Sequence, residues 1–341
     1  MKAVQIKSHG SFDKLNVVNI DDPTCFSNQV KVKIKYSSIN HLDIWLRKGI
    51  PGLDISLPRT LGSDASGTIV EIGKNVSGFK AGDDVIIQPG VFNNNCEIAK
   101  SGNEHLSPSY GILGESFDGV QSEYVCLNPI NVFPMPKKCS YKEASSFGLT
   151  FMTAYEMLIK RAQIKPNDVV LIYGGTSGVG SAGIQIAKDI GCKVISTCGN
   201  INKIDFIKSL GADYVLLHND NLYENLKDYL DKRKIDVVFE HIGARTWMTS
   251  MKVLAKGGRV VTCGATTGGN VNINLSHIFF KNLSIIGSTM GSIDTFKEVC
   301  KKIDNNIYRT VIDKVFDVSD IAKAHEYIEK RKNLGKVLLK F

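Results

Sequence analysis

The sequence has no apolar run that approaches the ~18 residues needed for a membrane-spanning helix. Its first residues, MKAVQIK, pass directly into an alternating pattern and contain no signal-peptide core. The eight cysteines are scattered and form no C-x-x-C pair, so we expect free thiols in a reducing compartment. These absences predict a soluble, cytoplasmic protein with no membrane partner.

Blocks of like charge are also missing, although the net charge is +8. The lysines are dispersed through apparent strands and helix surfaces. We therefore expect a solvated basic surface, which can help to attract an anionic cofactor, and no nucleic-acid partner. The alternative is nucleic-acid binding, which would be detected as a steeply salt-dependent retention of an oligonucleotide.

The strongest signal is the stretch from Asp168 to Gly191, DVVLIYGGTSGVGSAGIQIAKDIG. Val169–Tyr173 is an unbroken apolar run, typical of a strand buried on both faces of a parallel sheet. Glycines and then a helical pattern follow at once. A glycine-rich match alone would indicate only a tight turn, but this order favours a loop that holds a pyrophosphate at a helix N-terminus. The predicted cofactor-binding residues of this loop are Gly175, Thr176, Ser177, Gly178, Val179 and Gly180.

The pattern of the chain changes near residue 130. Before it, short strands and turns predominate, as in Val30–Ile34, and one short helix is predicted over His41–Lys48. After it, strands alternate with helices such as Leu222–Lys232. The predicted strands are 169–173, 193–197, 214–217, 236–240, 258–263 and 283–288. Six strands with crossovers predict a doubly wound parallel sheet, with a ligand at the carboxyl ends of its strands.

The residues after 290 are expected to return to the first domain. They are predicted to form a helix, a strand near Val311–Phe316, a second helix around Ile321–Lys330 and a closing strand, Lys336–Leu339. We thus predict an α/β protein with two domains, one of residues 1–129 completed by 291–341 and one of residues 130–290. The Gly-, Asn- and Ser-rich region 89–119 is predicted to be a loop excursion.

Together these features resemble the medium-chain dehydrogenase/reductase superfamily over essentially the whole chain. The resemblance implies a GroES-like β-barrel catalytic domain and a Rossmann domain with a six-stranded parallel sheet. Within the superfamily the chain is most similar to quinone oxidoreductases and to a prokaryotic group labelled alcohol dehydrogenases. The motifs that carry the resemblance are NHLDIWLRKG (40–49), LGSDASG (61–67), GDDV (82–85), TAY (153–155), the glycine loop, CGATT (263–267), GSTMG (287–291) and LGKV (334–337).

Zinc-dependent members of the superfamily hold their catalytic ion with a Cys in the first motif, a His in the second and a Cys or Asp shortly before T-A-Y. Those places hold Asn40, Ser63 and Leu149 here, and none of these side chains offers a thiolate or an imidazole. Asp64 alone does not make a site. The excursion that carries four structural cysteines in zinc-dependent relatives retains only Cys96. The resemblance therefore implies that neither metal is present.

The end of the second predicted strand bears on the choice of cofactor. An NAD site places a carboxylate there, about 20 residues after the glycines, to bind the ribose 2′-OH. Here Lys193–Thr197 is followed by CGNINK, which has no carboxylate, while Asn200 and Lys203 can donate to a 2′-phosphate. We therefore predict NADP(H). The alternative is that Lys203 is only a solvated residue and that NAD(H) binds without discrimination.

The resemblance also implies where the nicotinamide end and the substrate bind. The candidate catalytic residues are Asn40, Asp43, Trp45, Ser63 and Thr153. The further cofactor-binding candidates are His41, Gly264, Ala265, Thr266, Ser288, Thr289, Met290 and Lys336. Asn40 and Thr153 are expected to fix the carboxamide or the substrate carbonyl. The alternatives are a helix N-cap for Asn40, a solvent-facing or capping hydroxyl for Thr153, and a core position for Trp45.

Without zinc no Lewis acid polarises an alcohol, and the sequence offers no dedicated general base. Reduction of a quinone or an α,β-unsaturated carbonyl is easier, because charge delocalises onto the carbonyl and water can return the proton. We therefore predict an NADPH-dependent oxidoreductase of such small molecules, and the resemblance implies a homodimer or homotetramer formed through the edge of the cofactor sheet. The alternatives are a zinc-independent alcohol or aldehyde dehydrogenase and a nucleotide-binding protein with little catalysis.

Overall fold

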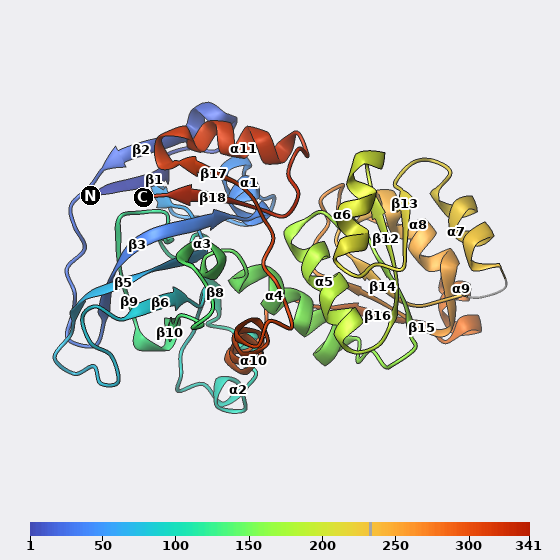
Figure 1. Ribbon diagram of the computed structural model, residues 1–341, viewed down its shortest axis with the longest axis horizontal. Helices are drawn as coiled ribbons and strands as arrows, with labels where there is room; N and C mark the ends of the chain where they lie inside the picture. Colours follow the sequence, from blue (N-terminus) through green and yellow to red (C-terminus); the bar gives the residue numbers. More distant parts are fainter. Residues whose placement is uncertain (232–233) are drawn as a thin grey trace. The chain divides into compact units, whose positions relative to one another are not determined.

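The computed structural model describes residues 1–231 and 234–341, and these residues form two compact units (Figure 1). One unit comprises Met1–Leu149 and Ser292–Phe341, and the other comprises Thr150–Gly291. The change of pattern placed a boundary near residue 130. In the structure β10 (Val132–Pro134) pairs with β6 (Asp84–Ile87), so the first unit continues beyond that point.

The central strand of the first unit is β3 (Val30–Ile39). It runs antiparallel to β5 (Asp64–Ile72), to β9 (Tyr124–Leu127) and to β18 (Lys336–Lys340). The main sheet has the order β10-β6-β5-β3-β18-β17, in which β17 (Ile312–Asp317) is the outer neighbour of β18. Because the last strand of the chain pairs with β3, the C-terminal residues complete this sheet.

The first unit also contains helices and shorter strands. Two of its helices, α1 (His41–Lys48) and α11 (Ile321–Glu329), share a buried apolar cluster that includes Ile44, Leu46 and Ile328. The helix predicted over His41–Lys48 is therefore confirmed at both ends. The remaining strands and α-helices of the unit are β1 (Lys2–Ile6), β2 (Leu15–Asn19), β4 (Arg59–Thr60), β7 (Gly90–Val91), α2 (Glu97–Lys100), β8 (Gly111–Ile112), α3 (Tyr141–Ala144) and α10 (Ile293–Asp304).

The second unit contains a six-stranded parallel sheet, as the sequence predicts. Its strands are β11 (Val169–Ile172), β12 (Lys193–Cys198), β13 (Tyr214–Leu217), β14 (Ile235–Glu240), β15 (Leu254–Thr262) and β16 (Ser284–Gly287). Their order is β13-β12-β11-β14-β15-β16, so the chain leaves β11 toward one side and returns to the other. In such sheets the ligand binds at this reversal, beyond the carboxyl ends of the strands.

Helices lie on both faces of this parallel sheet (Figure 1). Leu171 and Tyr173 share a buried cluster with α7 (Leu222–Leu230) and α8 (Ala244–Val253), whereas Ile172 lies toward Gly183 of α5 (Gly178–Asp189) on the opposite face. Burial on both faces explains the unbroken apolar run of β11. The other α-helices of these residues are α4 (Gly148–Tyr155), which begins two residues before the unit, α6 (Ile204–Ser209) and α9 (Leu275–Lys281). The helix predicted over Leu222–Lys232 ends at Leu230, and Lys232 lies outside the described residues.

Two of the absences in the sequence have structural counterparts. Within residues 1–231 and 234–341, no helix has the length and the apolar character to traverse a bilayer. All eight cysteines are free, and two of them, Cys192 and Cys198, are buried.

Candidate active site

A buried polar network lies where β3 is flanked by β5 and β18 in the first unit. The register sets Val337 opposite Ile39, so Lys336 and Asn40 are neighbours at the end of this pair of strands. The side-chain amide Nδ2 of Asn40 donates to Oδ2 of Asp64 over 2.9 Å. The Lys336 ammonium donates to Oδ1 of Asn40 and, over 3.4 Å, to Oδ2 of Asp64. Sheet pairing thus joins three residues that lie far apart in the sequence.

The Asp64 carboxylate has a partner for each oxygen, although it is almost completely buried. Its Oδ1 accepts from the backbone N–H of Leu149 over 2.7 Å, and its Oδ2 also accepts from the hydroxyl of Ser38 over 3.3 Å. Leu149 therefore contributes its backbone, not its side chain, at the third zinc-ligand place of zinc-dependent relatives. Burial lowers the pKa of Lys336, and the carboxylates of Asp64 and Asp43 oppose that shift.

Asp43 is held by backbone N–H groups at the start of α1. Its Oδ2 accepts from the N–H of Asn40 over 2.7 Å, and its Oδ1 accepts from the N–H of Gly62 over 2.9 Å. Asn40 occupies the N-cap position of α1, which was the alternative role predicted for it. Its side chain, however, forms hydrogen bonds with Asp64 and Lys336. Complete burial raises the pKa of Asp43 to about 6.

This shift predicts a pH dependence of stability. The folded-state pKa of about 6 exceeds the ordinary value of 3.8, so the contribution of Asp43 is fully present below about pH 3.8 and is lost as the pH rises through about 6. Relative to Asp43→Asn, we expect the wild type to lose about 1 kcal/mol of unfolding free energy between about pH 5 and about pH 7. Urea unfolding of both proteins at the two pH values measures this difference. An identical pH dependence of the two proteins would contradict it.

The donors in this network do not fit a catalytic zinc. Oδ1 of Asn40 accepts from an ammonium, and the Ser63 hydroxyl donates to the carbonyl oxygen of Leu113 over 2.8 Å. The positive charge of Lys336 beside Asp64 opposes a second cation. In the part of the chain that the structure describes, no group of three or more His, Cys, Asp or Glu residues is placed to hold a metal ion.

The other side chains of α1 differ in their exposure. His41 is exposed and Trp45 is half-buried, and their rings meet edge-on with centroids 6.0 Å apart. Trp45 is therefore not a core residue. Arg47 is buried, pairs with Glu329 of α11, and places its guanidinium carbon 4.5 Å from the centroid of the Phe12 ring. Arg47 thus fastens α1 to α11.

In the second unit the glycine loop joins β11 to α5. Gly174 has a φ of +58°, in the left-handed region that favours glycine. A Cβ on Gly175 would lie 2.4 Å from Oγ of Ser196, and a Cβ on Gly180 would lie 2.3 Å from the carbonyl oxygen of Gly174. The Ser177 hydroxyl caps α5 by accepting from the N–H of Gly180 over 2.9 Å. The first turn of α5 and its positive dipole end therefore follow the carboxyl end of β11, where they suit a pyrophosphate.

The remaining candidates of this unit follow the carboxyl ends of neighbouring strands. After β12, Asn200 is exposed and Lys203 is half-buried, and the Asn200 side-chain oxygen accepts from the N–H of Asn202 over 2.9 Å. Gly264, Ala265 and Thr266 follow β15, and Ser288, Thr289 and Met290 follow β16. Because the strands are parallel, these segments share the edge of the sheet at which the glycine loop begins.

Two buried hydroxyls of this unit have no hydrogen-bond partner among the described residues. They are Oγ1 of Thr153, in α4, and Oγ of Ser288, after β16. Buried polar groups are normally hydrogen-bonded, so such groups fit a polar ligand like a nicotinamide carboxamide. Thr153 is only 7% exposed, so the solvent-facing alternative for its hydroxyl does not hold.

The end of β14 carries two further polar residues that no motif in the sequence marked. The Glu240 carboxylate is completely buried and accepts from the N–H groups of Ile242 and Gly243 over 2.7 and 3.1 Å. It also accepts from the hydroxyl of Ser250 over 2.8 Å, so this acid fixes the turn that follows the strand. His241 comes next and lies against the glycine loop. The signal that could have found both is their place, directly after an apolar strand of a parallel sheet.

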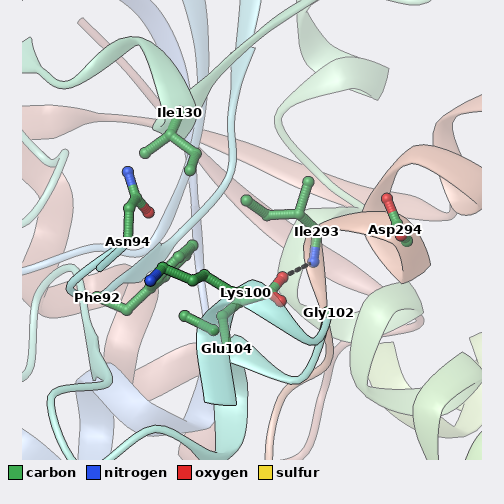
Figure 2. Close-up of a pocket in the computed structure, with 9 residues that line it drawn as sticks. Phe92, Asn94, Lys100, Gly102, Glu104, Ile130, Ile293 and Asp294 are labelled. Atoms are coloured by element: carbon green, nitrogen blue, oxygen red, sulfur yellow. Dashed lines mark hydrogen bonds between the residues drawn. The ribbon is translucent and has the colours of Figure 1, made fainter. Parts of the chain in front are cut away.

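Figure 2 shows a pocket of about 190 Å³ in the first unit, between the loop excursion and the start of α10. The Glu104 carboxylate is buried there and accepts from the backbone N–H of Ile293, in the first turn of α10. Lys100, at the rim, pairs with Glu97 over 2.8 Å. Both charged groups therefore have partners within the protein. The pocket follows from how the loop is fastened to α10, and none of the candidate active-site residues lines it.

Comparisons with known proteins place this geometry in context. Residues 27–137 match the family described as alcohol dehydrogenase GroES-like domain, and residues 178–305 match the family described as zinc-binding dehydrogenase. A crystal structure of an NAD-dependent alcohol dehydrogenase is 35% identical, with a TM-score of 0.96 and 100% of both chains covered. The NAD-dependent alcohol dehydrogenase of Sulfolobus acidocaldarius is 29% identical and covers 100% of this chain and 99% of its own length. The quinone oxidoreductase of Homo sapiens is 27% identical over 96% of this chain and 94% of its own.

The family predicted from the sequence is confirmed by these similarities and by the parallel sheet. The GroES-like region precedes a region that begins within the glycine loop, at residue 178, and the relatives are named as alcohol dehydrogenases and quinone oxidoreductases. The chain belongs to the medium-chain dehydrogenase/reductase superfamily and is an NAD(P)H-dependent oxidoreductase.

Proposed function

We propose that this protein uses NADPH to transfer a hydride to a quinone or an α,β-unsaturated carbonyl, without zinc. The observation that carries the proposal is the Asn40–Asp64–Lys336 network, in which an ammonium lies beside the carboxylate. Without a Lewis acid nothing lowers the pKa of an alcohol or polarises an isolated carbonyl. Conjugated acceptors need less assistance, because they spread the charge that arrives with the hydride.

The cofactor would supply the hydride, and the residues of the chain would bind and orient the reactants. The glycine loop and the first turn of α5 would hold the pyrophosphate, and the unpaired hydroxyls of Thr153 and Ser288 would receive the nicotinamide carboxamide. Lys336 and Asp64 hold the two ends of the Asn40 amide. One N–H of that amide thus stays in a fixed direction, where it can donate to a substrate carbonyl.

The two buried carboxylates of the network are poor general bases for the oxidation of an alcohol. Both oxygens of Asp43 accept backbone N–H groups, and both oxygens of Asp64 accept hydrogen bonds as well. A base must reach the proton that it removes, and these oxygens are already directed at other donors. This arrangement favours the reduction of a carbonyl acceptor over the oxidation of an alcohol.

The preference for NADPH is supported by the end of β12. Asn200 and Lys203 follow that strand, and the next acid, Asp205, lies on α6. We expect Lys203→Ala to raise the Kd for NADPH about tenfold while leaving the Kd for NADH unchanged, because only NADPH carries the 2′-phosphate. Lys208→Ala on α6 is the matched control. Cofactor fluorescence titrations measure both constants, and an unchanged Kd for NADPH would favour binding without discrimination.

Steady-state assays test the proposed reaction. Protein dialysed against a chelator should still oxidise NADPH with a naphthoquinone or an enone, and it should turn over a primary alcohol with NADP⁺ far more slowly. Elemental analysis of the same sample should show no stoichiometric zinc. Loss of activity on dialysis, with recovery on adding zinc, would contradict the proposal.

Two alternatives have their own outcomes in these assays. A zinc-independent alcohol or aldehyde dehydrogenase is favoured by the relatives named alcohol dehydrogenases, and the primary alcohol would then be the better substrate. A nucleotide-binding protein with little catalysis would bind NADPH tightly and turn over none of the three compounds.

The edge of the parallel sheet supports a homo-oligomer. Among the residues that the structure describes, strand β16 pairs with β15 alone, and Ile285 on this strand is 39% exposed. Phe279 and Phe280 of the preceding helix are 59% and 72% exposed. We propose that a second copy covers this edge, because unpaired strand edges invite pairing. Light scattering of the wild type and of Ile285→Lys tests this proposed oligomer.

The eight unpaired thiols support a cytoplasmic location.

A further inference from the structure

His241 lies directly after β14, next to the reversal of strand order at β11. Its ring borders the glycine turn, because a Cβ on Gly174 would lie 3.2 Å from the ring carbon Cε1. The backbone of His241 is also tied down, since its carbonyl oxygen accepts from the Thr266 hydroxyl over 3.3 Å. His241 thus lies at the same edge of the parallel sheet, beyond the carboxyl ends of the strands, as the candidate cofactor residues of this unit.

One hydrogen bond decides which ring nitrogen carries the proton. Nε2 of His241 lies 2.8 Å from the carbonyl oxygen of Tyr173. A carbonyl oxygen only accepts, so Nε2 is the donor, and Nδ1 of the neutral ring is an acceptor. Burial lowers the pKa of His241, which keeps the ring neutral. Within residues 1–231 and 234–341, no group donates to Nδ1. This atom is not among the fully buried atoms that lack a partner, so a ligand can reach it.

The neighbouring residues hold the ring in this orientation. Phe239 meets it edge-on with centroids 6.1 Å apart, and Glu240 binds the two backbone N–H groups that follow it. An acceptor that a bound ligand covers selects ligand groups that carry a hydrogen and disfavours groups that only accept, such as phosphate oxygens. In a dinucleotide the hydroxyls of the riboses are donors that lie beside the pyrophosphate, and the glycine loop next to His241 would hold that pyrophosphate.

We propose that His241 is a cofactor-binding residue whose Nδ1 accepts a hydrogen bond from a ribose hydroxyl of the dinucleotide. The inference rests on the proposed function, because it takes the glycine loop to be the pyrophosphate site. It adds to that site a side chain that directly follows β14, on the opposite side of β11 from Asn200 and Lys203.

Titration of NADPH fluorescence with purified full-length protein tests the inference. We expect His241→Phe, which keeps a ring but has no acceptor, to raise the Kd at least about fivefold. His241→Gln, whose amide can both donate and accept, should raise it less. His277→Phe on α9 is the matched control and should bind like the wild type. Thermal melts without cofactor show whether each variant is folded. If His241→Phe is not folded, the Kd of His241→Gln is compared with that of the wild type instead.

The outcomes separate the two ideas. If the wild type binds NADPH and both His241 variants bind it equally well, the role of His241 is wrong and the proposed function stands. If the wild type binds neither NADPH nor NADH, the proposed function fails and the role of His241 fails with it. A rise in Kd that is confined to the His241 variants supports both.

Discussion

Gly180→Ala is expected to raise the Kd for the dinucleotide by about 100-fold, because the new methyl group has no room. A Cβ at this position would lie 2.3 Å from the carbonyl oxygen of Gly174. That oxygen belongs to the backbone of the turn, so it cannot rotate away as the end of a flexible side chain could. The turn must open, and the first N–H groups of α5 then move from the place where they would meet the pyrophosphate. Cofactor fluorescence titration measures the loss.

Gly183→Ala supplies a control in the same helix and with the same chemical change. A Cβ there would meet the Phe239 ring at 3.5 Å, which is an ordinary contact. Alanine is favoured over glycine inside a helix by ~1 kcal/mol, so we expect wild-type binding and an equal or higher melting temperature. Equal binding by Gly180→Ala and Gly183→Ala would show that the glycine turn does not shape the cofactor site.

Lys336→Met is expected to lower the free energy of unfolding by about 3 kcal/mol at neutral pH. The substitution leaves the Asp64 carboxylate buried without its ammonium, and Asp64 is only 1% exposed. It also removes the donor to Oδ1 of Asn40, so the amide loses one of its two anchors. Urea unfolding followed by circular dichroism measures the change.

Two further variants separate charge pairing from a general effect of removing a lysine. Lys340→Met, on the same strand but exposed, should unfold like the wild type. The double variant Asp64→Asn with Lys336→Met should regain part of the lost stability, because no unpaired charge remains in the interior. A single Lys336→Met variant as stable as the wild type would contradict the pairing.

The secondary structure of the second unit follows from local pattern. Strand β13 is found at the predicted residues 214–217, and the other predicted strands of the parallel sheet differ from the observed bounds by a few residues at most. Apolar runs of that length and spacing are local information, and they require only that both faces of the sheet be covered. The helix over His41–Lys48 is local in the same way, because Asn40 precedes it and Gly49 ends it. The start of β15 at Leu254 is less predictable, since Lys256 and two glycines interrupt the apolar pattern there.

The candidate site could be predicted only in part from local sequence patterns. The motifs placed Asn40, Asp43 and Thr153 in the site, but they did not show that the side chain of Asn40 is held between an acid and an ammonium. His241 matched no motif, because its role depends on the approach of the glycine turn to the end of another strand. The buried, unpaired hydroxyl of Thr153 is likewise visible only after folding.

The sequence by itself determined the order of the elements, the two-part organisation of the chain, the glycine loop and the absence of zinc-ligand side chains at the places of the family motifs. Only the tertiary structure decided which charges meet. Lys336 and Asn40 are separated by 296 positions, and they become neighbours because β18 pairs with β3 in one register. The reason is physical: periodicity reports how a segment buries its own surface, whereas pairing between distant strands depends on the closure of the whole sheet.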